Sequence, residues 1–469
     1  MVPKRIFREY DIRGEMEKEL TPEFAYQLGR AFSQALKEKN PAAQRVSVGR
    51  DARLSSPELA EQIIKGILDS GVNVIDIGLC PTPLQYFSLY HLDLDGGIMV
   101  TGSHNPPEYN GFKLSIGKET IFGKDIQRIR EIIEEGKYQY SGKGHLENYD
   151  IIRAYKDYIE KELSYLAKED YPVLKVVIDS GNGTAGLVAP DILRALGCEV
   201  VELYSEPDGR FPNHHPDPTV VDYIQDLIVR TKQTGAHIGV GYDGDADRIG
   251  VVNRNGQIIW GDQLMIVLSR DILKTHPGAK IIADVKCSDI LFDDIKRHGG
   301  QPIIWKTGHS LVKEKMRAEK ALLAGEFSGH IFIAERYFGY DDAIYTTVRL
   351  VEIMKKEKKD ITELLSDVPR LYFTPEIRIP CPDEKKKAVV ERVVKNFLEY
   401  RQNGGSPYRV VDLNTIDGVR VKFEEGWALL RMSNTQPVVV MRVEAISEDA
   451  MEAYRDFMEN EFKKALEAL

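Results

Sequence analysis

The chain has 469 residues, of which 42% are hydrophobic and 29% are charged, so it is long enough for about three or four domains with separate cores. Its 63 Lys and Arg residues are outnumbered by 73 Asp and Glu residues, and the formal net charge is −10. An acidic balance argues against nucleic acid or an anionic membrane as the main partner, although a local basic pocket for a small anion is compatible with it.

The chain shows no sign of membrane insertion or export. No apolar run approaches the roughly 18 residues of a membrane-spanning helix, and the N-terminal segment lacks the apolar stretch of a signal peptide. The four cysteines are widely scattered, which is typical of reduced thiols rather than of a disulfide framework. We therefore expect a cytoplasmic protein with small-molecule partners, and the sequence leaves both a monomer and a homodimer open.

One pattern occurs three times along the chain: a short apolar run, an amphipathic helical segment that ends near a glycine, and a second apolar run. The three units begin near Val46, Lys175 and Lys280. Apolar runs that alternate with helices indicate βαβ units with mainly parallel, buried strands. The sequence therefore predicts three related domains of the α/β class.

The pattern changes after about residue 368. Short apolar segments at 418–423, 427–432 and 438–445 lie between two helical patterns, which predicts an antiparallel sheet covered by helices on one face. This region is expected to form a fourth, α+β domain. The predicted domain boundaries are 1–150, 151–253, 254–368 and 369–469.

The first loop with candidate chemistry, residues 101–113, follows the apolar run at 97–100. Ser103 stands on a turn between a glycine and prolines at the end of a predicted strand, a position that faces a cleft in α/β proteins. Ser103 is a candidate nucleophile or phosphate carrier, with His104 and Lys113 as nearby donors, and a plain polar turn is the alternative. The motif Gly-x-Ser-x-Gly is absent, which argues against an esterase.

The second loop carries Asp243, Asp245 and Asp247 between two predicted strands. Carboxylates at i, i+2 and i+4 on a turn can converge on one hard cation, whereas without a cation two such charges ~4 Å apart repel by roughly 4 kcal/mol. An EF-hand is excluded because Arg248 and Arg254 occupy the positions that need Gly and Glu. We expect a metal site, with a solvated acidic turn as the alternative.

Two further loops carry weaker signals. The segment 325–330 offers the carboxylate of Glu326, the hydroxyl of Ser328 and the imidazole of His330, groups that suit sugar hydroxyls. The segment 431–437, followed by Arg442, combines hydroxyls, an amide and guanidinium groups, and this set is typical of a phosphate-binding turn. Each is equally compatible with a structural turn.

In this order, the loops resemble those of the α-D-phosphohexomutase superfamily, and most closely its bacterial phosphomannomutase/phosphoglucomutase branch. The resemblance covers essentially the whole chain and rests on five motifs, which are Tyr10-Asp-Ile-Arg-Gly, Thr101-Gly-Ser-His-Asn-Pro, Asp243-Gly-Asp-Ala-Asp-Arg, Gly325-Glu-Phe-Ser-Gly-His and Arg431-Met-Ser-Asn-Thr-Gln-Pro. It implies four domains around a central cleft, and an isomerase that moves a phosphoryl group.

The resemblance also implies a role for each site residue. Ser103 would carry the phosphoryl group and would contact Mg²⁺ together with Asp243, Asp245 and Asp247. The other implied catalytic residues are Arg13, His104, Lys113, Arg248 and His330, of which Lys113 and His330 are candidate proton shuttles. The implied substrate-binding residues are Tyr10, Lys286, Gly308, His309, Glu326, Ser328, Arg431, Ser433, Asn434 and Thr435.

The implied reaction interconverts hexose 1-phosphate and hexose 6-phosphate through a bound hexose 1,6-bisphosphate. Phosphoglucosamine mutases tend to carry Gln at the position of Phe327 and Ala at that of Gly102, so the sequence favours glucose and mannose phosphates. The alternatives are a phosphoglucosamine mutase, a non-catalytic sugar-phosphate sensor and a metal-dependent phosphatase. The presence of Ser103, all three aspartates and the phosphate-binding turn argues against a sensor.

Overall fold

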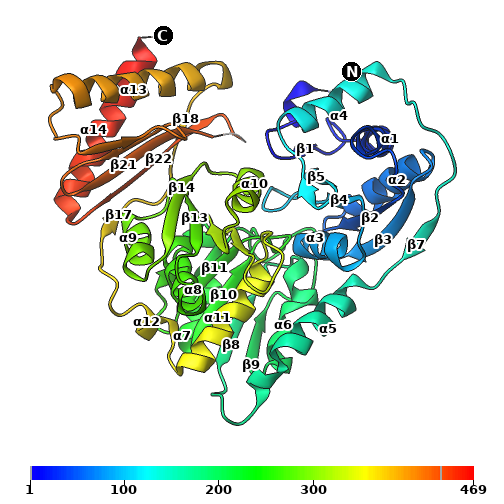
Figure 1. Ribbon diagram of the computed structural model, residues 1–469, viewed down its shortest axis with the longest axis horizontal. Helices are drawn as coiled ribbons and strands as arrows, with labels where there is room; N and C mark the ends of the chain where they lie inside the picture. The colour runs from blue at the N-terminus through cyan, green and yellow to red at the C-terminus, as the bar shows by residue number, and fades with distance from the viewer. Residues whose placement is uncertain (1–2, 434–435, 469) are drawn as a thin grey trace.

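The computed structural model describes residues 3–433 and 436–468, and four β-sheets organise this part of the chain. We refer to each sheet with its helices as a unit, numbered one to four in chain order. Figure 1 shows unit one, in blue and cyan, opposite unit four, in orange and red, with the other two units joining them. The chain therefore brings its first and last parts to two sides of one molecule.

Unit one contains a seven-stranded sheet with the order β1-β5-β4-β2-β3-β7, and β6 pairs with β5. Its strands are β1 (Ile12–Glu15), β2 (Arg45–Arg50), β3 (Asn73–Leu79), β4 (Gly96–Val100), β5 (Tyr109–Ile116), β6 (Glu119–Thr120) and β7 (Leu146–Asn148). Its helices are the short η1 (Lys4–Ile6), α1 (Pro22–Lys39), α2 (Ser56–Leu68), α3 (Thr82–His91) and α4 (Lys124–Glu135). Helix α1 starts where the Thr21 hydroxyl accepts a hydrogen bond from the Phe24 N–H.

Units two and three contain smaller sheets, with the orders β12-β11-β10-β8-β9 and β14-β13-β15-β16. The strands of unit two are β8 (Lys175–Asp179), β9 (Glu199–Leu203), β10 (Ile238–Tyr242), β11 (Ile249–Asn253) and β12 (Ile258–Ile259). Its helices are α5 (Ile151–Leu163), η2 (Ser164–Ala167), η3 (Thr184–Leu187), α6 (Ala189–Ala195), η4 (Val221–Ile224) and α7 (Gln225–Thr234).

The strands of unit three are β13 (Lys280–Asp284), β14 (Gln301–Trp305), β15 (Leu323–Gly325) and β16 (Ile331–Ile333). Its helices are α8 (Gly261–Thr275), α9 (Asp289–Arg297), α10 (His309–Glu319), α11 (Ala343–Glu357) and α12 (Ile361–Leu364). The three predicted repeats therefore open with β2, β8 and β13, as the sequence pattern indicated.

The same four-strand core occurs in all three of these sheets. The first strand (β2, β8 or β13) pairs in parallel with the second (β3, β9 or β14) and with the third (β4, β10 or β15). The third strand then pairs antiparallel with the fourth (β5, β11 or β16). This shared topology confirms the prediction of related α/β units, with mixed sheets built on a parallel core.

Unit four has an antiparallel six-stranded sheet with the order β17-β22-β21-β20-β19, and β18 pairs with β22. Its strands are β17 (Tyr372–Phe373), β18 (Ile377–Pro380), β19 (Asp412–Asn414), β20 (Val419–Lys422), β21 (Gly426–Met432) and β22 (Val438–Ala445). Helices α13 (Asp383–Asn403) and α14 (Glu448–Glu467) cover one face, as expected. On the other face Trp427 and Leu429 pack against Val285 of unit three.

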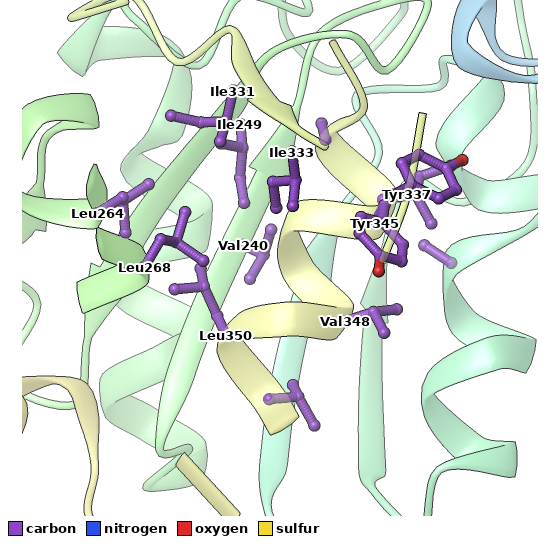
Figure 2. Packing of buried hydrophobic residues seen from close by; sticks show 14 of the residues in the cluster. Val240, Ile249, Leu264, Leu268, Ile331, Ile333, Tyr337, Tyr345, Val348 and Leu350 are labelled. Carbon is purple, nitrogen blue, oxygen red and sulfur yellow. The ribbon is translucent and has the colours of Figure 1, made fainter. Parts of the chain in front are cut away.

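Units two and three share one hydrophobic core, to which β3 and α3 of unit one also contribute, whereas unit four has a core of its own. Figure 2 shows side chains from β10, β11, β16, α8 and α11 packed together, among them Val240, Ile249, Ile331 and Leu350. Continuous burial of this kind holds the two middle units as one body. Throughout residues 3–433 and 436–468, no helix is both long and apolar enough to cross a membrane.

Candidate active site

A cleft of about 970 Å³ receives side chains from all four units. The residues that line it include Ser103, Asp247, Glu326 and Ser433, each from a different predicted motif. Further members of the predicted set at its wall are Tyr10, Arg13, His104, Lys113, Arg248, Lys286, Gly308, His309, Ser328, His330 and Arg431. Motifs that are hundreds of residues apart in the sequence therefore face one cavity.

Three of the four motif loops occupy equivalent places in the repeated core. The segments 101–108, 243–248 and 326–330 each connect a third, parallel strand to the antiparallel fourth strand. Ligands of open α/β sheets bind beyond the carboxyl ends of the parallel strands, so each unit presents this loop to the same cavity. The fourth loop, 433–437, joins β21 and β22 of unit four.

Ser103 is buried at the base of the cleft, with 3% of its surface exposed. Its hydroxyl donates a hydrogen bond of 2.9 Å to Oδ2 of Asp243 and lies 3.0 Å from Nδ1 of His104. Its backbone has a φ of 49°, a conformation that L-residues other than Asn and Asp rarely adopt. Unit one thus presents one serine oxygen directly to the acidic loop of unit two.

Asp243, Asp245 and Asp247 are almost completely buried, and one oxygen of each lies within 4.8 Å of the others. Asp243 Oδ1 accepts hydrogen bonds from the N–H groups of Asp247 and Arg248, which shapes the turn. Burial, together with the neighbouring Asp247 and Asp245, raises the pKa of the Asp243 carboxyl well above its ordinary value. Three crowded carboxylates of this kind need compensating positive charge.

The acidic cluster fits a hard cation. Oδ1 of Asp245 and Oδ1 of Asp247 are buried and have no hydrogen-bond partner among residues 3–433 and 436–468. Buried carboxylate oxygens without a hydrogen-bond partner, in a cluster this compact, are suitable ligands for a hard divalent ion. A second cluster, of Asp247, His330 and Asp341, contains an imidazole and is less suited to such an ion.

Lys113 neutralises part of this charge. Its ammonium group donates to Oδ2 of Asp245 over 2.8 Å and also to Oδ2 of Asp247. Burial lowers the pKa of Lys113, but the two carboxylates outweigh that effect and the pKa lies well above its usual value. In this arrangement Lys113 remains an ammonium group.

The carboxylate of Glu326 stabilises the predicted sugar-binding loop, 325–330, through two hydrogen bonds. Glu326 Oε1 accepts a hydrogen bond of 2.9 Å from the Gly308 N–H, and Oε2 accepts one of 3.1 Å from the Ser328 hydroxyl. Glu326 is 3% exposed, and burial raises its pKa. The carboxylate of Glu326 and the hydroxyl of Ser328 therefore lie together at the cleft wall.

His330 and His309 form the back of this wall, with ring centroids 5.7 Å apart. Arg248 Nε donates to Nε2 of His330 over 2.9 Å, while Nδ1 of His330 lies 3.1 Å from Oδ2 of Asp341. Burial, assisted by Lys313, lowers the pKa of His309 well below its ordinary value. The lone pair of His330 Nε2 is therefore engaged in the hydrogen bond from Arg248.

The N-terminal motif contributes to the cleft wall from unit one and contacts unit three there. Tyr10 donates to the Thr307 carbonyl over 2.9 Å, and Arg13 donates to Oδ1 of Asn105 over 2.7 Å. Gly308 has a φ of 135°, and a Cβ added there would lie 2.4 Å from the Tyr10 ring. Gly308 therefore allows units one and three to approach closely.

Two basic side chains of the cleft wall, Arg431 of unit four and Lys286 of unit three, form ion pairs with acidic residues. Arg431 Nε donates to Oδ2 of Asp417 over 2.8 Å, and Lys286 donates to Oε1 of Glu376 over 2.7 Å. Burial lowers the pKa of Lys286, but Glu376 and Asp284 raise it to about 12, so the ammonium persists. Ser433 lines the cleft beside them, whereas the predicted Asn434 and Thr435 lie outside the described residues.

Arg442, which the sequence associated with the phosphate-binding turn, faces elsewhere. It is 1% exposed, and its guanidinium lies 3.8 Å from the centre of the Phe327 ring and donates to the Lys286 carbonyl. Strand alternation places Arg442 on the sheet face that packs on unit three. The expectation for Arg442 was therefore wrong.

Sequence reasoning also missed several polar residues of the cleft wall, among them His215, Asp217, Glu376 and Arg378. His215 donates to the His104 carbonyl, and Glu376 pairs with Lys286. The only signal for them in the sequence is weak, namely polar residues beside Pro216 and Pro375. Their contribution depends on contacts between units.

A cleft enclosed by four units, with a serine beside an acidic cluster and basic groups opposite, defines an enzyme of the α-D-phosphohexomutase class. The phosphoglucomutase/phosphomannomutase family matches nearly the whole chain: its α/β/α domains I, II and III match residues 4–140, 153–256 and 260–372, and its C-terminal domain matches 376–461. The chain belongs to this family and is an isomerase of the phosphohexomutase type.

Individual relatives agree with this assignment. The phosphomannomutase/phosphoglucomutase of Pseudomonas syringae pv. tomato is 45% identical over 465 residues, which cover 99% of this chain and 96% of the relative. The crystal structure of a family protein from Burkholderia thailandensis has a TM-score of 0.90 at 40% identity and covers 99% of this chain and 98% of that one. An N-acetylphosphoglucosamine mutase of Aspergillus fumigatus in complex with glucose 1,6-bisphosphate shares the fold, with a TM-score of 0.62 at 13% identity over 100% of this chain and 96% of that one.

Proposed function

We propose that this phosphohexomutase interconverts the 1-phosphates and 6-phosphates of glucose and of mannose, with phospho-Ser103 as donor and a hexose 1,6-bisphosphate as bound intermediate. The observation that carries the proposal is the hydrogen bond between the Ser103 hydroxyl and Asp243, in a cleft that also contains Glu326 and Arg431. Phosphoryl transfer needs mainly positioning and charge neutralisation, and these groups supply both.

In the first step, a free hydroxyl oxygen of the bound hexose phosphate bonds to phosphorus while the bond between phosphorus and Ser103 Oγ breaks. The hydroxyl proton leaves to a basic group, and Ser103 Oγ takes up a proton as it is released. His330 and Lys113 are the candidate proton carriers, and His330 Nε2 can accept a proton only when it gives up its hydrogen bond from Arg248. The bisphosphate then turns over, and Ser103 Oγ takes the other phosphoryl group. In this second step Ser103 Oγ gives up its proton and the released sugar oxygen takes one up, so both proton carriers end in their starting states.

Asp243, Asp245 and Asp247 would hold Mg²⁺, which when bound adds positive charge against the roughly −2 charge of a phosphoserine. The remaining positioning comes from the chain itself. Glu326 and Ser328 orient the sugar through its hydroxyls, and Arg431 with Ser433 binds the phosphate that does not react. One binding site for both phosphates explains why substrates of either orientation can be accepted.

Glucose and mannose differ only at C2, and the cleft offers Glu326 and Ser328 to hydroxyls that both sugars share. Phe327, which distinguishes this loop from that of phosphoglucosamine mutases, is 5% exposed and stacks on Trp260 with ring centroids 5.3 Å apart. The 45% identity to a relative named for both mannose and glucose phosphates supports the same choice. Phosphoglucosamine mutase and sugar-phosphate sensor functions are less well supported.

The test compares glucose, mannose and glucosamine 1-phosphates in a coupled assay with added hexose 1,6-bisphosphate. We expect kcat/KM for glucose and mannose 1-phosphates to differ by at most about a hundredfold, or roughly 2.7 kcal/mol, and glucosamine 1-phosphate to be poorer than both. A preference above about ten-thousandfold between the two epimers, or glucosamine 1-phosphate as the best substrate, contradicts the proposal. Binding without turnover of any sugar would indicate a sensor.

A further inference from the structure

Arg53 lies beneath the serine loop, although neither the predicted site nor the cleft wall includes it. Its side chain is completely buried, and its guanidinium donates to four carbonyl groups of one loop. Nη1 donates to the carbonyls of Pro106 and Tyr109 over 2.5 and 2.8 Å, and Nη2 to those of Ser103 and Asn105 over 2.9 and 2.5 Å. Buried carbonyls need partners, and this irregular loop obtains them from one side chain.

Asp51 completes the arrangement. Its Oδ2 lies 3.2 Å from Nε of Arg53 and accepts a hydrogen bond of 3.0 Å from the Gly102 N–H. The other oxygen, Oδ1, accepts from the Arg53 N–H and from the Ser56 hydroxyl. A buried arginine is tolerated only when its charge is compensated and most of its donors are used. The carboxylate of Asp51 compensates the charge, and the four carbonyls accept from Nη1 and Nη2, whereas Nε makes no hydrogen bond among the described residues.

Gly102 is the residue that lets Arg53 approach. A Cβ at position 102 would lie 2.3 Å from Nε and 2.4 Å from Cζ of Arg53, closer than side chains can come. The guanidinium cannot yield, because it is fixed by its bonds to the loop. The next residue, Ser103, has the disfavoured φ of 49°, and its carbonyl is one of the four that Arg53 binds.

We propose that Arg53 is the positioning residue of the serine loop, holding Ser103 in its left-handed conformation, and that in this chain the Arg53 guanidinium leaves no space for a side chain at position 102. This inference rests on the proposed role of Ser103 as the phosphoryl carrier. A planar guanidinium can serve four carbonyls at once, whereas the ammonium of lysine has three donors on a single atom. A lysine at position 53 would therefore keep the positive charge but could not make the same four hydrogen bonds to the loop carbonyls.

The experiment compares Arg53→Lys, Gly102→Ala and the double variant with wild type. A displacement of the reacting group by about 1 Å costs about a hundredfold in rate, so we expect kcat to fall about a hundredfold in each single variant. KM for glucose 1-phosphate should stay within about threefold of wild type, because other units bind the sugar. Arg50→Lys is the control, since the Arg50 guanidinium pairs with Asp76.

The double variant tests the link between the two residues. If Gly102 serves Arg53, adding Gly102→Ala to Arg53→Lys should lower kcat by less than about threefold more, because the flexible lysine is not fixed to the loop and can move aside. Losses that multiply to about ten-thousandfold would overturn the proposed link. An Arg53→Lys enzyme with wild-type kcat would overturn the positioning role.

Hydrogen exchange provides a readout that does not depend on activity. We expect the amides of residues 101–111 to exchange faster in Arg53→Lys than in wild type, while those of unit four keep their rates. Unchanged exchange in 101–111 overturns the role of Arg53 even if the mutase is active. A wild-type protein without mutase activity would instead remove the proposed function, and the exchange data would still decide whether Arg53 holds the loop.

Discussion

Units one and three share one local arrangement, in which an aspartate after the first strand binds the loop after the third strand, but the neighbouring basic residue differs in its role. In β2 and β13 the last residues paired with the third strand are Arg50, opposite Val100, and Ala283, opposite Gly325. An aspartate follows in each case, and it accepts a hydrogen bond from the second N–H of the adjacent loop: Asp51 from Gly102, and Asp284 from Phe327. The serine that follows is Ser103 in one loop and Ser328 in the other.

The difference lies in the basic residue two positions beyond each aspartate. Lys286 of unit three reaches the cleft wall, whereas the side chain of Arg53 in unit one lies beneath the serine loop and binds its carbonyl groups. Accordingly, the residue before the serine is Gly102 where the guanidinium must approach and Phe327 where a ring packs against Trp260 and Arg442. The basic residue at this position therefore adds positive charge to the cleft in unit three, whereas in unit one it fixes the conformation of the serine loop.

The equivalent serines Ser103 and Ser328 are expected to have different roles. The variant Ser103→Ala tests this difference and should have the largest effect. Removing the oxygen that carries the phosphoryl group should lower kcat by more than about a thousandfold while hexose phosphate still binds. Turnover is measured in the coupled assay, and binding by calorimetry. Near-wild-type kcat in this variant would end the assignment of unit one as the unit that supplies the reacting group.

Metal removal tests the loop of unit two, which occupies the same place as the serine loops. Exhaustive chelation should reduce activity to below about a hundredth, and Mg²⁺ should restore it. Because the ion binds the folded state, it should also raise Tm, by an amount equivalent to roughly 2.7 kcal/mol at a hundredfold excess over Kd. Asp243→Asn is the control, and its Tm should respond much less to Mg²⁺. Full activity of the demetallated enzyme contradicts a metal site.

Unit four differs from the other three in topology, and Arg431→Ala tests whether it binds the phosphate that does not react. Loss of a charge-assisted contact should weaken binding by roughly 1.5–3 kcal/mol, and hexose 1-phosphate and hexose 6-phosphate should be affected alike. The matched control is Arg409→Ala, since Arg409 pairs with Glu424 and is exposed. A defect for one substrate only would mean that the two phosphates use different sites.

Ser328→Ala should give the smallest effect, and it tests whether the serine of unit three has a different role from Ser103. The variant loses one neutral hydroxyl, which bonds to Glu326 and is proposed to contact the sugar, so kcat/KM should fall by about tenfold or less. Steady-state kinetics with both glucose and mannose 1-phosphates provide the measurement. A loss as large as that of Ser103→Ala would show that the two loops cannot be told apart by their chemistry.

Much of the architecture was predictable because it depends on local patterns. The strands that open the three repeats and the antiparallel strands of unit four follow from runs of apolar residues, and the helices from their amphipathic spacing. The triad Asp243, Asp245 and Asp247 follows in the same way, since alternate residues of one short turn can converge. The predicted domain boundaries and the individual catalytic roles stay predictions.

The sequence by itself determined the α/β class, the repeat and the motifs of the family, because each is written in residues that are close along the chain. Only the tertiary structure decided which motifs meet and which way long side chains turn. Arg53 lies beneath a loop that starts about fifty residues later, and Arg442 packs on Phe327 rather than in the phosphate-binding turn. Such outcomes depend on the space and hydrogen-bond partners that distant segments provide, which no local pattern records.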